Sequence, residues 1–172
     1  KDSILTASKA YYSAYQFDEA LELLEKHRDE FYKDMVYLQA LENNYKTVGD
    51  YMEALSTIDA MKKVEPLSRK MKIERTILLR KMKKYSLALD QILNVVKSDS
   101  TKRYVLEQVG DLYRLVLMHD SAMVYYTTAL KNTPGIITPD KKSLKQSACH
   151  LYIIRITKNA KLSRDGLFQH LQ

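Results

Sequence analysis

The sequence FDEALELL, at residues 17 to 24, returns in altered form three more times along the chain. YMEALSTI stands at residues 51 to 58, YSLALDQI at 85 to 92 and HDSAMVYY at 119 to 126, so each copy begins 34 residues after the one before it. A period of this length is typical of repeat proteins, in which units too small to bury a core alone stack on their neighbours. We therefore align the chain in windows of 34 residues.

The windows 1–34, 35–68, 69–102 and 103–136 align without an insertion. One column of the alignment is alanine throughout: Ala20, Ala54, Ala88 and Ala122. Large apolar side chains fill other columns, among them Leu24, Ile58, Ile92 and Tyr126, and Tyr11, Tyr45, Leu79 and Tyr113. A constant alanine fits two helices that cross closely, because a longer side chain would hold them apart. We expect these columns to form the core.

Each window has the pattern of two amphipathic helices, since apolar residues return every three or four positions on both sides of a short break. In the second window Gly49 and Asp50 make the break, and Gly49 can take the positive φ that ends a helix at little cost. Pro66 and Pro134 close the second and fourth windows, where proline cannot continue a helix. The sequence therefore predicts an all-α chain of antiparallel helix pairs.

This pattern resembles the tetratricopeptide repeat, a unit of about 34 residues built as helix, turn and helix. The resemblance depends on short stretches in every window: Ala10 to Tyr12, Phe17 to Ala20, Leu41 to Tyr45, Gly49 to Tyr51, Ala54-Leu55, Tyr85, Ala88-Leu89, Gly110 to Tyr113, Ala122 and Pro134. It implies a right-handed α-solenoid of four units over residues 1–136. The family's small residue on the first helix is glycine only at Gly110, and its tryptophan is absent. In the other windows that column holds Ser8, Glu42 and Thr76.

The end of the chain departs from the pattern. Residues 137–172 are expected to form a degenerate fifth unit or capping helices, because a stack leaves its last face uncovered unless a terminal helix hides it. Within this segment residues 141–158 have the spacing of a helix, and a truncated unit is the alternative. The chain opens with Lys1 and no signal-peptide pattern, so we interpret it as an excised domain or a mature chain.

Composition excludes several classes of protein. The longest apolar runs are only a few residues, far short of the roughly 20 that a membrane helix requires. The single cysteine, Cys149, excludes a disulfide within the chain, although it does not separate a cytoplasmic from a periplasmic protein. Cys149 and His150 are neighbours that a helix would point about 100° apart, so they do not make a nucleophile and its base. Without a phosphate loop or paired metal ligands, we predict a protein that is not an enzyme and holds neither cofactor nor metal.

Charge is concentrated in one part of the chain. Residues 62–84 carry ten lysines and arginines against two glutamates, a net charge of +8, whereas the net charge of the whole chain is +7. The first window is acidic. This asymmetry indicates a partner of negative charge near the third window.

In tetratricopeptide-repeat proteins the first helices of successive units line a concave groove that takes an extended peptide or a partner helix. Carried over by position, the groove would contain Tyr12, Asn43, Lys46, Lys70, Ile73, Ile77, Arg80, Lys81, Arg114 and Lys145. Our hypothesis is that the cations pair with carboxylates of an acidic or C-terminal peptide, while the apolar members bury its side chains. The alternative is a solvated basic face without a ligand.

Some members of the family bind chaperones by clamping a terminal carboxylate with lysine and asparagine side chains. Lys9, Asn43 and Lys70 match part of such a clamp, but other residue types stand at the remaining positions: Leu5, Ala40 and Glu74. We therefore expect no chaperone binding.

Two functions compete with that of a protein-interaction scaffold. The sequence DSAMVYY at residues 120 to 126 is similar to repeats of bacterial regulators and membrane-anchored proteins, which would make this chain a sensing or docking module of a longer protein. The net charge of +7 suggests nucleic-acid binding as the other competing function. Helical-repeat RNA readers, however, place one reading position in every repeat, whereas the cations here gather in one window, so a protein partner ranks first. The compartment and the oligomeric state stay open.

Overall fold

A computed structural model describes residues 1–98, 102–131, 133–138 and 155–156. Within these residues it contains eight α-helices and one pair of two-residue strands. The prediction of an all-α helical repeat is confirmed. No helix in the described part of the chain is both long and apolar enough to cross a membrane. The chain divides into two compact units, Lys1–Gln91 and Ile92–Gln172, which we describe one at a time.

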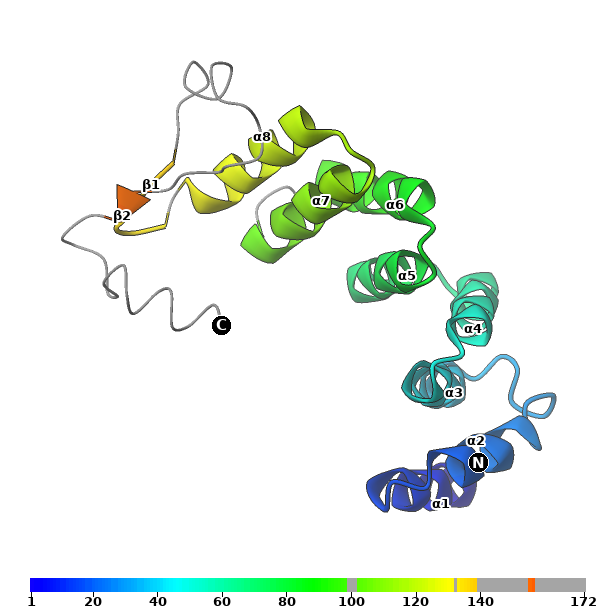
Figure 1. Ribbon diagram of the computed structural model, residues 1–172. Helices are drawn as coiled ribbons and strands as arrows, with labels where there is room; N and C mark the ends of the chain where they lie inside the picture. The colour runs from blue at the N-terminus through cyan, green and yellow to red at the C-terminus, as the bar shows by residue number, and fades with distance from the viewer. Residues whose placement is uncertain (99–101, 132, 139–154, 157–172) are drawn as a thin grey trace. The chain divides into compact units, whose positions relative to one another are not determined.

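The first unit is built from helix hairpins that follow one another along the chain. Its elements are α1 (Asp2–Ser13), α2 (Phe17–Glu25), α3 (Met35–Val48), α4 (Tyr51–Val64), α5 (Arg69–Lys81) and the start of α6 (Tyr85–Ser98). Each of the helices from α1 to α4 packs on the helix that follows it. In Figure 1 the first helices of the pairs, α1, α3 and α5, lie on one side of this unit, and α2 and α4 lie on the other.

The core of the first unit follows the predicted columns. Ala20 and Ala54 are completely buried, as are Leu24 and Leu41, and Ile58 and Tyr45 are nearly so. Ser8 Oγ donates a hydrogen bond to the Ala20 carbonyl at 3.4 Å, which shows how closely α1 and α2 cross. The alanine column is therefore confirmed as a close helix crossing.

Tyr11 departs from the predicted core. It occupies the same column as the buried Tyr45, yet it is 40% exposed. Tyr45 is covered from the preceding helix pair, where the Arg28 guanidinium donates to its hydroxyl at 3.3 Å. In this structure α1 has no preceding pair, so Tyr11 lacks the neighbours that bury its counterpart.

The turn inside each helix pair repeats one backbone geometry. Four residues at the same place in successive windows have positive φ: Tyr15 (61°), Gly49 (84°), Lys83 (59°) and Leu117 (62°). Across each turn the next residue's amide donates to a carbonyl five positions back, as in Asp50 N to Tyr45 O at 2.9 Å and Lys84 N to Leu79 O at 2.9 Å. This is the Schellman ending of a helix, which satisfies carbonyls that have no partner within the helix. The positive φ predicted for Gly49 is confirmed.

Side chains cap several helices at their N-termini. Asp34 accepts from the Tyr37 amide at 2.9 Å, Asp50 from the Glu53 amide at 3.1 Å and Ser68 from the Met71 amide at 3.3 Å. Such caps satisfy amides that the first turn of a helix leaves unpaired. They fix where α3, α4 and α5 begin.

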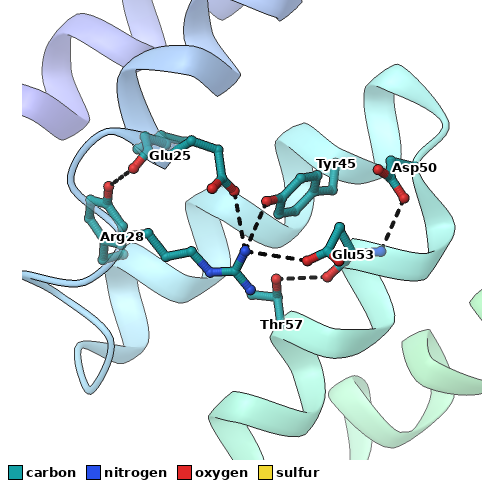
Figure 2. A network of polar contacts seen from close by, with 8 residues as sticks. Glu25, Arg28, Tyr45, Asp50, Glu53 and Thr57 are labelled. Atoms are coloured by element: carbon teal, nitrogen blue, oxygen red, sulfur yellow. Dashed lines mark hydrogen bonds and ion pairs between the residues drawn. The ribbon is translucent and has the colours of Figure 1, made fainter.

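Consecutive pairs in the first unit are joined by charged side chains. Arg28, just after α2, lies 3.6 Å from Glu25 Oε1 and 3.3 Å from Glu53 Oε2 on α4 (Figure 2). At the next junction Arg75 on α5 reaches both carboxylate oxygens of Asp59 on α4, at 3.1 and 3.5 Å. Glu25 is only partly exposed, and burial raises its pKa. These pairs connect one hairpin to the next.

The second unit contains the end of α6, then α7 (Arg103–Leu115) and α8 (His119–Leu130), which pack on each other. Tyr113 and Tyr125 stack with their ring centres 5.4 Å apart. His119, which falls in an aromatic column, is exposed.

A short antiparallel pairing follows α8. Strand β1 (Ile136–Ile137) pairs with β2 (Arg155–Ile156), with Ile136 opposite Ile156. The helix predicted over residues 141–158 is therefore wrong at Arg155 and Ile156. The helical spacing there did not reveal that the backbone pairs with a segment some 20 residues earlier, because strand pairing is decided by non-local contacts. The rest of that prediction lies outside the described residues.

Candidate functional site

A hollow of about 410 Å³ opens between α1 and α3. It is lined by Leu5, Ser8, Lys9, Tyr12, Val36, Gln39, Ala40, Asn43 and Asn44. Lys9 is the one charged side chain among these lining residues, and none of them carries a carboxylate. The hollow therefore combines an apolar surface with a single positive charge, a composition that suits an apolar side chain beside an anionic group.

Carboxamide side chains run along the α3 wall of this hollow. Gln39 and Asn43 are four residues apart, so both lie on one face of the helix and both are exposed. Asn44 is 5% exposed; its Nδ2 donates to the Ala40 carbonyl at 2.8 Å, while its Oδ1 has no hydrogen-bond partner among the described residues. Carboxamides both donate and accept hydrogen bonds, as a peptide backbone requires.

Tyr12 is held in place at the edge of the same hollow. Its hydroxyl and Thr47 Oγ1 are 2.9 Å apart, within hydrogen-bond distance, and its ring packs edge-on against Phe17 with centroids 5.0 Å apart. The side chain is 39% exposed. Because one tyrosine contacts both α2 and α3, it presents a fixed aromatic surface to solvent.

A second, smaller hollow of about 160 Å³ lies between α3 and α5. Its lining residues are Gln39, Glu42, Asn43, Lys46, Ile58, Met61, Ser68, Lys70, Met71 and Glu74. Gln39 and Asn43 also line the first hollow. The two hollows therefore adjoin each other across α3 and form one continuous face, which we call the α1–α3–α5 face.

The charges of the second hollow largely engage one another. Lys46 Nζ lies 3.3 Å from Glu42 Oε1 and donates a hydrogen bond to Glu74 Oε1 on α5. Burial acts to lower the pKa of Lys46, but the Glu74 and Glu42 carboxylates outweigh it and raise that pKa. Burial raises the pKa of Glu42, against the effect of Lys46, which lowers it. Lys46 is thus already neutralised by the protein's own carboxylates.

The structure brings together four of the ten residues predicted for the groove. Tyr12, Asn43, Lys46 and Lys70 line the two hollows. The remaining α5 residues line neither hollow: Ile73, Ile77, Arg80 and Lys81.

The other predicted groove residues are placed less favourably or elsewhere. Ile73 is 8% exposed, which leaves it little surface for burying a ligand's side chain. Ile77 and Arg80 are half-buried, and Lys81 is exposed. Arg114 is exposed on α7 in the second unit, and Lys145 lies outside the described residues.

Sequence reasoning missed several lining residues. Leu5, Val36 and Gln39 line the first hollow but were not assigned to the groove. The spacing of Gln39 and Asn43 on one helix face was the available signal. Glu42 was noticed only as a departure from the small-residue column. Its burial beside Lys46 depends on how closely α5 approaches α3, which the sequence does not show.

Metal chemistry has no support in the described part of the chain, where no group of three or more histidine, cysteine, aspartate or glutamate side chains could hold an ion. Cys149 and His150 lie outside that part.

Comparison with known proteins shows which type of fold this chain has. No family model and no curated protein matches the sequence. Among solved structures, a MamA chain from Desulfovibrio magneticus RS-1 has a TM-score of 0.66 at 20% identity, covering 76% of this chain and 73% of that chain. YrrB, described as a tetratricopeptide-repeat protein with an unusual peptide-binding site, has a TM-score of 0.61 at 15% identity, covering 76% of this chain and 67% of that chain. Both are tetratricopeptide-repeat proteins, so this chain has a tetratricopeptide-like helical-repeat fold.

Proposed function

We propose that this chain is a non-enzymatic protein-interaction scaffold that binds an extended acidic peptide on the α1–α3–α5 face. The observation that carries the proposal is the pair of adjoining hollows, which share Gln39 and Asn43 and contain apolar surface, carboxamides and cations. The helical-repeat fold supports a scaffold in general, because such folds present extended concave surfaces to partners.

Each part of the face has a chemical counterpart in a peptide. Leu5, Val36 and Tyr12 offer apolar surface to a side chain, while Gln39 and Asn43 can donate to and accept from the peptide backbone. Carboxylates of the peptide would pair with the cations that line the two hollows. Lys9 lines the first hollow and Lys70 the second, and both are exposed.

Lys9 and Lys70 are better candidates for this pairing than Lys46, the third cation that lines the hollows, or the nearby Arg75 on α5, which lines neither. Lys46 is held between Glu42 and Glu74, and Arg75 is paired with Asp59. The concentrated positive charge of residues 62–84 then acts at longer range, because a field of one sign speeds the approach of an oppositely charged ligand.

The test compares two charge-reversed double variants that alter the net charge equally. Lys9→Glu with Lys70→Glu changes the face, whereas Lys62→Glu with Lys63→Glu changes exposed lysines on α4 that line neither hollow. Binding of a fluorescein-labelled peptide of alternating aspartate and leucine is followed by fluorescence anisotropy at fixed ionic strength. We expect the face variant to lose affinity by about tenfold or more, the equivalent of a charge-assisted hydrogen bond, and the control by much less.

Three results would contradict the proposal. Equal losses in both variants would show that diffuse positive charge, and not the face, attracts the peptide. No binding by the wild-type chain would remove the acidic peptide as a ligand. Tighter binding of a single-stranded RNA than of the peptide, with a steep dependence on salt, would favour a nucleic-acid partner instead.

A further inference from the structure

Glu42 stands where its column otherwise has small or hydroxyl-bearing residues, Ser8, Thr76 and Gly110. A carboxylate at such a position is costly, because a buried charge loses its hydration. Glu42 is nevertheless 5% exposed and lines the hollow between α3 and α5. Its Oε1 lies 3.3 Å from Lys46 Nζ but has no hydrogen-bond partner among the described residues. Burial therefore favours the protonated form of Glu42, whereas the Lys46 ammonium favours the ionised form.

We propose that proton binding by Glu42 regulates how strongly the hollow between α3 and α5 holds an anionic group of the ligand. This inference rests on the proposed function and names a regulation of the same face. With Glu42 ionised, the lining contains two cations and two carboxylates, which balance: Lys46, Lys70, Glu42 and Glu74. With Glu42 protonated, the same lining carries one net positive charge.

Lys46 transmits the change. It is shared between Glu42 on its own helix and Glu74 on α5. When Glu42 becomes neutral, Lys46 retains one carboxylate partner instead of two, so more of its charge is available to a ligand carboxylate in the same hollow. The effect is local because the groups are within a few ångströms of one another in a partly buried site, where charges are weakly screened.

The charged neighbours of Glu42 come from several helices. On α3 the neighbour is Lys46, and from α5 both Glu74 and Lys70 act on the Glu42 carboxyl. From α4 the hollow is lined by Ile58 and Met61, which carry no charge, and α1 places Lys9 in the adjoining hollow. On α2 Glu25 is paired with Arg28. The cations acting on Glu42 favour its ionised form, while burial and Glu74 favour the protonated form.

The direction in which the pKa of Glu42 is shifted supports proton binding at this carboxyl. Burial is the largest influence on the pKa of Glu42 and raises it above the ordinary value of 4.5. Between that ordinary value and the raised one, the folded chain holds a proton that the unfolded chain has released. The contribution to stability is therefore present below the ordinary pKa and is lost as pH rises through the folded pKa. An anionic ligand in the hollow would raise the pKa further and take up a proton on binding.

The experiment measures affinity for the aspartate–leucine peptide from pH 7.5 to pH 5.0 with three chains: wild type, Glu42→Gln and Glu22→Gln. The glutamine introduced by Glu42→Gln has the shape of the protonated glutamate, so this variant should bind more tightly than wild type at pH 7.5, and the difference should shrink as pH falls. Wild type should gain about threefold to tenfold as pH falls, since one charge is removed near the anion. Glu22 is an exposed residue of α2 that lines neither hollow, and its variant should follow wild type. Titration of the peptide itself affects all three chains alike.

Parallel pH profiles in wild type and Glu42→Gln, with binding present, would overturn the inference and leave the proposed function standing. Absence of peptide binding by all chains at every pH would overturn both. A second measurement needs no ligand: the ¹³C shift of the Glu42 carboxyl, followed by NMR during a pH titration. A folded pKa at or below the ordinary value would also overturn the inference.

Discussion

The turn after each first helix places four different residues in one left-handed conformation. Gly49 adopts it at little cost, whereas Tyr15, Lys83 and Leu117 carry a Cβ atom that approaches the following carbonyl oxygen. The Schellman hydrogen bonds hold all four turns regardless of residue type. At three of the four turns the folded chain is therefore less stable than it would be with glycine at that position.

Lys83→Gly should stabilise the chain by about 0.5 to 1 kcal/mol, because the relief of the left-handed conformation exceeds the added entropy of glycine in the unfolded chain. Lys83 is exposed, so its replacement removes no core packing. The control is Lys81→Gly, the same change at the last residue of α5, where glycine should cost about 0.5 to 1 kcal/mol. The free energy of unfolding in urea measures both, and a loss of stability in Lys83→Gly would contradict the account.

The columns of the 34-residue alignment show which structural features the sequence predicts correctly. The alanine column, the buried Leu24 and Ile58, and the positive φ of Gly49 were all predicted correctly. These features depend on neighbours three or four residues away on the same helix or on the fixed partner helix. Tyr11 was predicted wrongly because its burial depends on a helix pair that this structure does not contain.

At the scale of the helix pair, the sizes of two facing side chains are matched where α7 crosses α8. In the first pair Ser8 faces α2, whose corresponding core residue is Leu24. In the α7–α8 pair the same two positions hold Gly110 and Tyr126. A Cβ atom built on Gly110 would lie 2.5 Å from Cε1 and 2.7 Å from Cδ1 of Tyr126. The smallest residue of the column is therefore matched to the largest side chain of its partner column.

Gly110→Ala should destabilise the chain by about 1 to 3 kcal/mol, the usual cost of overpacking, although alanine is otherwise the better helix former. The Tyr126 ring has little freedom to move because its hydroxyl donates to Asp111 Oδ1 at 2.7 Å; burial and this bond raise its pKa to about 12. Thermal unfolding measures the loss.

The matched control for the glycine substitution is the double variant Gly110→Ala with Tyr126→Leu. Leucine is the residue of the first window at this column, and it should restore most of the stability lost by the single change. An unchanged or larger loss in the double variant would mean that the Tyr126 ring is not what the new methyl group meets.

At the scale of the whole first unit, charged side chains determine how one hairpin lies on the next. Arg28 joins Glu25, Tyr45 and Glu53, and Arg75 joins Asp59. Apolar contacts alone are tolerant of small rotations between helices, whereas guanidinium–carboxylate pairs are directional. These junctions therefore contribute more to the geometry of the α1–α3–α5 face than to its stability.

Arg28→Met retains the apolar stem but removes the guanidinium, and it should cost about 1 kcal/mol. The pair is partly exposed, and Glu25 Oε1 is buried with no hydrogen-bond partner among the described residues. Arg103→Met is the control. Arg103 pairs with Glu107 within α7 and is more exposed, so its loss should cost less than about 0.5 kcal/mol. Urea unfolding at low and high salt distinguishes the two, and equal costs would show that the Arg28 junction does not stabilise the packing of consecutive pairs.

The helical repeat of this chain is readable from its residues alone. A 34-residue period, one alanine column and amphipathic spacing are local regularities, and each is a direct consequence of helices crossing at fixed distances. They correctly predicted helix pairs and their turns, and four of the predicted groove residues do line the two hollows.

Only the folded arrangement revealed which of those residues are available to a ligand. Lys46 and Lys70 are indistinguishable by residue type, yet Lys46 is engaged by Glu42 and Glu74 while Lys70 is exposed. The ion pair joins residues 28 positions apart on two helices. The pairing of a charge and the burial of Ile73 or Glu42 depend on distances between helices, and those distances arise from packing that no local pattern encodes.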